Sequence, residues 1–286
     1  MAANMKAVKL RMKSIQSTMQ ITKAMELVAS SKLRKAKERA DASRPYFHTL
    51  ENTLKQIAAG NTDLSSVYTK KSKSEKWCYV VIAGDRGLAG GYNSNIIRLV
   101  NSSLPAADTY VYALGRKGRD GLARRGFQIK ADYSEVMNEP MYRDAADLTV
   151  ELLDAFAQGQ VGEIYLAYTS FKNTVSQTPK LMKLLPVELE EQQEEDRAKA
   201  QALMTYEPDA EGVLDSIVPK YMSSLIYGAL LEAVASENGA RMTAMDSATS
   251  NAEEMIESLS LQYNRARQGA ITQELTEIVA GANAIS

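Results

Sequence analysis

Cysteine and histidine are almost missing from this sequence, which holds one of each, Cys78 and His48. A single cysteine excludes an internal disulfide framework and a cysteine-based zinc site, and it fits a reducing compartment. A single histidine argues against a Ser-His-Asp triad and against a histidine-rich metal site. We therefore interpret Cys78 as a small core residue of an apolar stretch, and His48 as a surface or seam residue.

Long apolar runs and a dominant charge are missing too. No stretch approaches the roughly 20 apolar residues that a membrane span needs. The opening MAANMKAVKL contains no apolar signal core. The formal net charge of −1 gives no overall attraction to nucleic acid. These absences predict a soluble chain without direct membrane insertion, free to dock on a membrane-bound partner.

A heptad pattern is what the sequence does have, and it begins near the N-terminus. Across residues 8–57 the chain places mostly apolar side chains at alternating steps of four and three residues. This 3.5-residue period, held for about seven heptads, is the mark of a left-handed coiled coil. Thr22, Glu26 and Ser43 are polar exceptions at the seam. Pro45 is expected to bend or interrupt the helix, because it removes one backbone donor.

The end of the chain repeats the pattern across residues 217–270, with small seam residues that allow close approach of a partner helix. Asn238 is a polar seam residue of the kind that fixes helix register. Pro208 and Asp209 mark the expected helix start. Pro219 predicts a kink or a later start of the regular helix.

The middle of the chain alternates apolar and amphipathic stretches, which is typical of a mostly parallel sheet covered by helices on both faces. The acidic stretch 188–199 is expected to be an exposed linker or a short helix, and its carboxylates a solvated face rather than a cation site. The expected elements are strands at 77–83, 109–114, 127–133, 163–170 and 174–185, and helices at 93–104, 116–125 and 143–158.

The predicted fold class is α/β, in which an antiparallel coiled coil of long N- and C-terminal helices flanks a Rossmann-like domain with a mostly parallel five-stranded sheet. The predicted domains are an N-terminal coiled-coil helix (1–60), a central α/β domain or foot (61–208) and a C-terminal coiled-coil helix (209–286). The two helices join the same domain, so they must run antiparallel when they pair. The seam spacing then places Met25 near Asp246.

The C-terminal helix is longer than its partner in this register. About 20 residues, from near Ala266 onward, have nothing of their own to pack on, which makes an overhang of about 30 Å. Its last part, residues 278–285, is almost wholly apolar and small. An isolated apolar helix tip is costly in water. This predicts a sleeve formed by another protein, with apolar walls inside which the tip can turn.

Two features suggest other functions. The stretch GDRGLAGGYN, residues 84–93, lies between an expected strand and an expected helix, where phosphate loops lie. It matches neither GxxxxGK[ST] nor GxGxxG, so a tight turn is the favoured interpretation and a nucleotide-binding α/β enzyme is an alternative. The first 50 residues hold 11 Lys and Arg against three acidic residues, crowded at 32–39. This suits an acidic partner, with a nucleic-acid-binding coiled coil as the second alternative. No residues suggest a cofactor, a metal site or a catalytic group.

Several stretches resemble the gamma subunit of the rotary (F-type) ATP synthase. They are SIQSTMQITKAMELVASSKLRKA (14–36), GDRGLAGGYN (84–93), TYEPD (205–209) and ARMTAMDSATSNAEEMIESLSLQYNRARQGAITQELTEIVAGANA (240–284). The resemblance spans essentially the whole chain, and the pairing of ITKAME with ITQELTEI is highly specific. The family usually has Cys where this chain has Ala89, and the chloroplast form carries an inserted segment with paired cysteines that is lacking here, so no thiol switch is expected.

The resemblance implies a non-catalytic central rotor stalk. Its rotation couples transmembrane proton flow to ATP synthesis or hydrolysis in the alpha/beta catalytic ring. The implied partners are the alpha and beta subunits of the catalytic head, the epsilon subunit and the membrane c-ring, with no nucleic acid. The lack of a transit segment indicates a bacterial protein or a processed organellar one. The implied location is peripheral, on the cytoplasmic face of the bacterial cell membrane.

The resemblance also implies positions that bind the catalytic head. Lys23 and Met25 match positions near the acidic levers of the beta subunits, and Arg241 matches a helix position at the same level. Arg267 and Gln268 match the pair that meets the beta catch loops. The guanidinium of Arg267 suits a forked, charge-assisted bond to a carboxylate that Lys would not reproduce.

Further positions follow from the same resemblance. Gln268, Thr272 and Glu274 match the family's upper coupling segment. Tyr206 and Glu207 match the foot positions that touch polar loops of the membrane ring.

Overall fold

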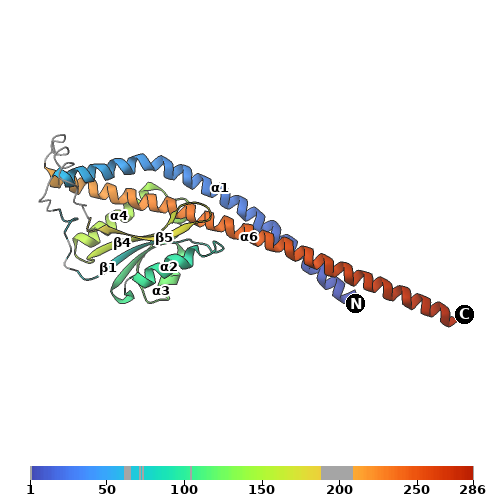
Figure 1. Ribbon diagram of the computed structural model, residues 1–286. Coiled ribbons are helices and arrows are strands. Elements are labelled where there is room, and N and C mark those ends of the chain that lie inside the picture. Colours follow the sequence, from blue (N-terminus) through green and yellow to red (C-terminus); the bar gives the residue numbers. More distant parts are fainter. Residues whose placement is uncertain are drawn as a thin grey trace. The chain divides into compact units, whose positions relative to one another are not determined.

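The computed structural model describes most of the chain (Figure 1), namely residues 2–60, 66–70, 72, 74–103, 105–187 and 209–285. Contacts divide the chain into two compact units. Met1–Ala29 and Arg241–Ser286 form unit 1, and Ser30–Ala240 forms unit 2. The expected linker at 188–199, with its acidic cluster, lies outside the described residues.

Two long helices form the two ends of the chain (Figure 1): α1 spans Ala2–Gly60 and α6 spans Ala210–Ile285. The start of α6 is where the sequence predicts it. Asp209 Oδ1 accepts a 2.7 Å hydrogen bond from the Gly212 N–H, which satisfies a donor of the first turn that has no partner within the helix. The neighbouring Pro208 lies outside the described residues.

Neither internal proline interrupts its helix. The helix α1 continues through Pro45 and α6 continues through Pro219, so the predicted interruption and the predicted later start are wrong. A proline inside a helix forfeits one backbone hydrogen bond. Packing of the neighbouring turns outweighs that loss, as where Phe47 stacks on Tyr221 with ring centroids 5.9 Å apart.

Within unit 1, the seam follows the predicted 3.5-residue period on both helices. Seam positions are buried or half-buried, whereas most positions between them are exposed. On α1 these positions are Val8, Met12, Ile15, Met19, Thr22, Glu26 and Ala29. On α6 they are Met242, Met245, Thr249, Ala252, Ile256, Leu259, Tyr263, Ala266 and Ala270.

Unit 2 is built on a five-stranded sheet with the strand order β3-β2-β1-β4-β5. The first four strands pair in parallel, and β5 runs antiparallel to β4 at one edge. A mixed, mostly parallel sheet between long terminal helices confirms the predicted fold class. The strands are β1 (Trp77–Ile82), β2 (Thr109–Leu114), β3 (Gln128–Asp132), β4 (Glu163–Phe171) and β5 (Gln177–Leu185).

Three shorter helices lie between the strands. They are α2 (Tyr92–Ser103), α3 (Arg116–Ala123) and α4 (Tyr142–Ala157). Short 3-10 turns precede β2 at Ala106–Asp108 and α4 at Val136–Asn138. Each lies within two residues of its predicted position. The alternation of strands and helices therefore places the sheet between two layers, as the sequence pattern indicates.

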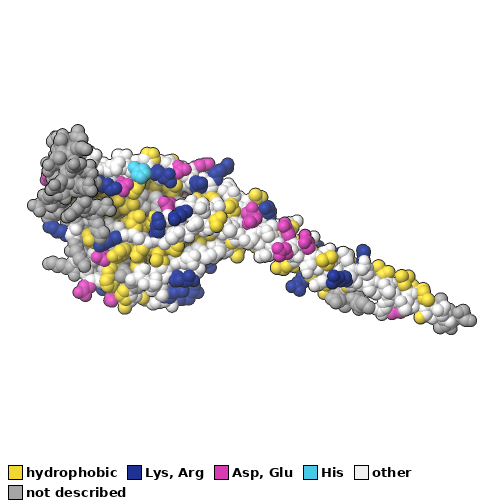
Figure 2. Space-filling view, in the orientation of Figure 1, with side chains coloured by type: hydrophobic (Ala, Val, Ile, Leu, Met, Phe, Trp, Pro, Cys, Tyr) yellow, Lys and Arg dark blue, Asp and Glu magenta, His cyan; other side chains and the backbone are white. Residues whose placement is uncertain are grey.

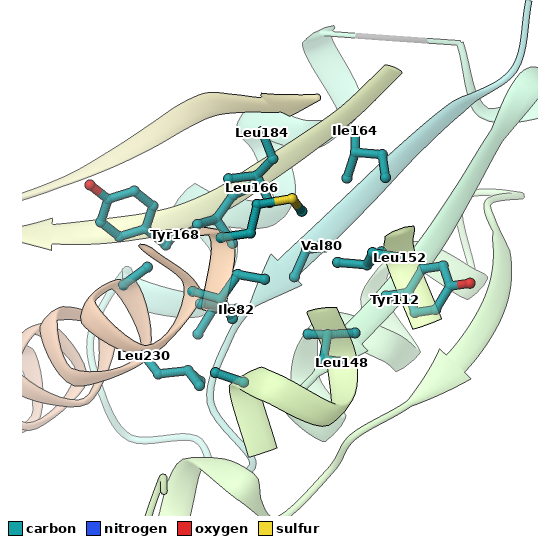
Figure 3. Packing of buried hydrophobic residues seen from close by; sticks show 14 of the residues in the cluster. Val80, Ile82, Tyr112, Leu148, Leu152, Ile164, Leu166, Tyr168, Leu184 and Leu230 are labelled. Atoms are coloured by element: carbon teal, nitrogen blue, oxygen red, sulfur yellow. The ribbon is translucent and has the colours of Figure 1, made fainter. Parts of the chain in front are cut away.

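The sheet buries a separate hydrophobic core on each face. Successive side chains of a strand point to opposite faces, so β1 sends Tyr79 and Val81 to the core under α2 and α3. It sends Val80 and Ile82 to the larger core, to which α1, α4 and α6 contribute. Figure 3 shows this larger core, with Leu230 of α6 among the labelled side chains. Residues of α6 are therefore part of the interior of unit 2.

Candidate functional site

A buried pair of threonines joins the two helices of unit 1, which are called the rod from here on. The hydroxyls of Thr22 and Thr249 lie 2.7 Å apart, and both side chains are buried. The seam spacing predicts that Met25 lies near Asp246. In an antiparallel pair, Thr22, three residues before Met25, then lies near Thr249, three residues after Asp246. The contact therefore confirms the antiparallel register that the seam spacing predicts.

On α1, the predicted contact residue Lys23 already has a partner of opposite charge. Lys23 Nζ lies 2.9 Å from Glu26 Oε2, and just over half of the lysine side chain, 54%, is exposed. The hydrogen bond and the charge of Glu26 raise the pKa of Lys23, and the carboxylates of Asp246 and Glu253 act in the same direction. Met25, beside this pair, is half-buried. This part of the rod therefore offers a compensated cation next to a partly accessible thioether.

The far part of α6 is a bare helix. Every side chain described from Ile271 onward is exposed, including Ile278 at 67% and Val279 at 58%. Within unit 1, α6 runs beyond the N-terminal end of α1 (Figure 1), and Figure 2 shows hydrophobic side chains along this projecting part. The predicted overhang is therefore confirmed, because this part of α6 extends past α1 and its described side chains are exposed.

The structure places most of the predicted contact residues on the rod. Four of them, Arg267, Gln268, Thr272 and Glu274, are exposed on the far part of α6. They form one segment, in which Thr272 Oγ1 donates a 3.0 Å hydrogen bond to the Gln268 carbonyl. Arg241 is half-buried at the start of the α6 part of unit 1.

The two predicted foot residues, Tyr206 and Glu207, lie outside the described residues.

The Gly-rich turn between β1 and α2 uses its polar groups within the chain. The Gly84 N–H donates to Asn93 Oδ1 at 2.8 Å. The Asp85 carboxylate accepts hydrogen bonds from the Arg116 N–H at 3.0 Å and from the Glu135 N–H at 3.1 Å. A carboxylate of the chain therefore lies at the start of α3, where a ligand anion would otherwise be favoured. This geometry supports the tight-turn interpretation over a nucleotide site.

The basic stretch at 32–39 is partly engaged within unit 2. Arg39 pairs with Glu139 at 3.0 Å, and the Lys37 ammonium lies 5.8 Å from the centre of the Phe171 ring. Side chains with such partners are less available to phosphates, which weakens the nucleic-acid alternative.

The lone cysteine and histidine behave as predicted. Cys78 is 1% exposed in the core, and His48 is a surface residue whose Nδ1 lies 3.4 Å from Glu51 Oε2. In the described part of the chain, no group of three or more His, Cys, Asp or Glu side chains is placed to hold a metal ion. None of the described helices is long and apolar enough to cross a membrane.

Sequence reasoning missed several contacts that fix the helices. Thr22 and Thr249 both occupy recognised seam positions, but no motif signals that their hydroxyls meet. A second such contact is the 2.9 Å hydrogen bond from Ser236 Oγ to the Thr169 carbonyl, which joins α6 to β4.

Known proteins match this chain along its whole length. The family described as ATP synthase matches residues 4–285. The ATP synthase gamma chain of Lachnoclostridium phytofermentans is 57% identical over 290 residues, covering 99% of this chain and 100% of that protein. The gamma chain of Acetobacterium woodii, named as sodium ion specific, is 41% identical over 302 residues and covers 100% of both chains.

Solved structures are similar as well. A chain in the central stalk/c-ring structure of the Tetrahymena thermophila mitochondrial ATP synthase has a TM-score of 0.59 and 29% identity, covering 80% of this chain and 99% of that one. A chain of the Euglena gracilis mitochondrial ATP synthase shares the fold, with a TM-score of 0.74 at 20% identity, covering 100% of this chain and 95% of that one. With the family model and the curated relatives in agreement over the full length, this chain belongs to the ATP synthase gamma-chain family.

Proposed function

We propose that this gamma chain, a non-catalytic stalk subunit of an F-type ATP synthase, works as a shaft that turns inside the catalytic head. The observation that carries the proposal is the bare end of α6, whose described side chains are all exposed from Ile271 onward. A single asymmetric shaft presents a different surface to each catalytic site, and only such differential contact shifts a conformational equilibrium. Turning the shaft thus changes the nucleotide affinity of each site in sequence.

The proposed partners are the alpha and beta subunits of the head, the epsilon subunit and the c-ring. The Tetrahymena relative was solved as part of a central stalk and c-ring, which supports assembly with a ring of that kind. The sleeve around the bare helix is assigned to alpha and beta, because apolar side chains such as Ile278 and Val279 need a partner that excludes water. The epsilon subunit is proposed on family resemblance.

The contact residues are proposed at two levels of the rod. Lys23 and Met25, together with Arg241, are assigned to the acidic levers of the beta subunits. At this level the Glu26 carboxylate lies against the Lys23 ammonium, so the pair presents no net charge. The upper level, assigned to the catch loops and the coupling segment, consists of Arg267, Gln268, Thr272 and Glu274.

The foot is proposed to be the central α/β domain at residues 61–208, which docks on the c-ring through Tyr206 and Glu207. The c-ring spans the membrane, and this supports a peripheral location on the cytoplasmic face of the bacterial cell membrane. Protons are the proposed coupling ion. A relative named for sodium is 41% identical to this chain, so we assign ion selection to the membrane ring and not to the shaft.

Rotation is tested by attaching a bead to the chain in a complex with alpha and beta subunits immobilised on glass. ATP is expected to drive rotation of the bead in one direction. An assembled complex that hydrolyses ATP while the bead only fluctuates would overturn the proposal.

The role of Met25 has its own test. Met25→Lys adds a positive charge beside Lys23 at the proposed beta contact, so ion pumping per ATP hydrolysed is expected to fall while assembly persists. Met255→Lys is the matched control, because Met255 is exposed on the same rod and no contact is assigned to it. Equal pumping per ATP in the two variants would remove Met25 from the proposed contact.

A further inference from the structure

Unit 2 has the strand topology that forms a ligand-binding crevice in other doubly wound folds. Such sheets bind ligands outside the carboxyl ends of the strands, where the strand order reverses. In the order β3-β2-β1-β4-β5, that point lies between β1 and β4. Gly84 follows the end of β1, and Thr169 lies near the end of β4.

In this chain the crevice holds a segment of α6. Ser236 is fully buried, and its Oγ donates a 2.9 Å hydrogen bond to the Thr169 carbonyl. The next residue, Glu237, contacts the other wall, since a Cβ added to Gly84 would lie 2.7 Å from Glu237 Oε1. Three residues after Ser236, Gly239 lies against Phe171, whose Cε2 would be 3.2 Å from a Cβ added to Gly239.

The sheet leaves the Thr169 carbonyl in need of this donor. The parallel pairing of β4 with β1 ends at Ala167. A buried carbonyl without a partner is destabilising. The Ser236 hydroxyl therefore completes the end of the strand as well as fixing the helix.

The contacts hold α6 from two directions. Ser236 and Gly239 are three residues apart and share one side of the helix, facing the β4–β5 hairpin. Glu237 lies about 100° further round the axis and faces the end of β1. Two walls at different angles oppose turning of the helix about its axis. The Ser236 hydrogen bond, which demands a defined distance and angle, also opposes sliding along the axis.

We propose that the α6 segment Ser236–Gly239, held in the switch-point crevice, is the joint through which torque passes between the shaft helix and the α/β domain, with Ser236 as its positioning residue. In related folds this crevice binds a cofactor, whereas in this chain it holds the α6 segment Ser236–Gly239. This inference rests on the rotor function proposed above.

The test compares Ser236→Ala with Ser216→Ala in the assembled complex. Ser216 is on the same helix, but its Oγ bonds only to the Val213 carbonyl of that helix among the described contacts. With the head immobilised and a bead on the α/β domain, Ser236→Ala is expected to widen the angular fluctuations of the bead and to lower ion pumping per ATP. Amide exchange in the β4–β5 hairpin is expected to rise about tenfold.

The outcomes separate the joint from the rotor function. Suppose that the bead rotates on complexes with Ser216→Ala, and that Ser236→Ala shows the same angular fluctuation and the same ion pumping per ATP. The joint is then refuted, while the proposed rotor function is retained. If the beads on both variants fail to rotate under ATP, the rotor function fails first. Should Ser236→Ala not assemble, Ser236→Thr and Ser236→Val replace it, because they share a shape and only Thr can donate. Equal angular widths for these two would also refute the joint.

Discussion

The buried threonine pair in unit 1 predicts that two substitutions will interact. Replacing either Thr22 or Thr249 by Val keeps the branched shape and removes one hydroxyl. The two oxygens lie 2.7 Å apart. Each also lies near a carbonyl of its own helix, Met19 O at 3.0 Å and Met245 O at 2.9 Å. One hydroxyl therefore donates across the seam while the other donates within its helix.

The magnitude follows from what each variant leaves behind. A single Thr→Val change removes the bond across the seam and sets a methyl group against a buried hydroxyl, at a cost of about 1 kcal/mol. The remaining hydroxyl keeps its own helix carbonyl, which prevents a larger loss. The double variant places two methyl groups together in an apolar seam, which is close to neutral. The coupling energy between the sites is thus about 1 to 2 kcal/mol.

Urea unfolding of the full chain, followed by circular dichroism, measures this coupling from the wild type, the two single variants and the double variant. Thr18→Val is the control, because Thr18 is exposed and its Oγ1 bonds to the Ser14 carbonyl of its own helix. Additive single variants, with a coupling below about 0.3 kcal/mol, would refute the hydroxyl pairing. Disulfide formation between Met25→Cys and Asp246→Cys then reports whether the double variant keeps the register.

Three further predictions concern other parts of the chain. Deleting residues 278–286 is expected to leave the unfolding midpoint of the free chain unchanged, because Ile278 and Val279 are exposed, but to reduce torque in single-molecule rotation; full torque would contradict the sleeve. Arg267→Lys is expected to lower ion pumping per ATP more than Arg265→Lys does, because Lys lacks the forked donor; equal pumping would remove Arg267 from the contact. Burial raises the pKa of the Cys78 thiol, so a thiol reagent at pH 8 is expected to label only urea-unfolded chain, and rapid labelling of native chain would contradict the buried position.

The rod was predictable because its signal is local and repeated. Heptad stepping from Val8 identifies every buried or half-buried position that follows Val8 on the α1 part of unit 1, apart from Met25. Antiparallel pairing follows from connectivity alone. The interruption at Pro45 and the later start at Pro219 were wrong, because one lost hydrogen bond was weighed without the packing of the surrounding turns, such as Phe47 on Tyr221.

The joint at Ser236 was not predictable in the same way. Ser236 and Thr169 are 67 residues apart in sequence, and their meeting depends on where the sheet reverses its strand order. Of the proposed contact residues, Lys23 was proposed from the resemblance, whereas its pairing with Glu26 follows from side-chain geometry. Sequence pattern thus locates the surfaces, and tertiary packing decides which polar groups on them are free.

The residues on the edges of the sheet affect how readily the unassembled chain aggregates. Exposed strand edges invite pairing with other chains, and lysine or proline on them discourages it. The outer strand β5 carries Pro179 and Lys180, and the opposite outer strand β3 carries Lys130 and Asp132. These residues therefore disfavour edge-to-edge pairing between newly synthesised subunits that have not yet joined the ATP synthase complex.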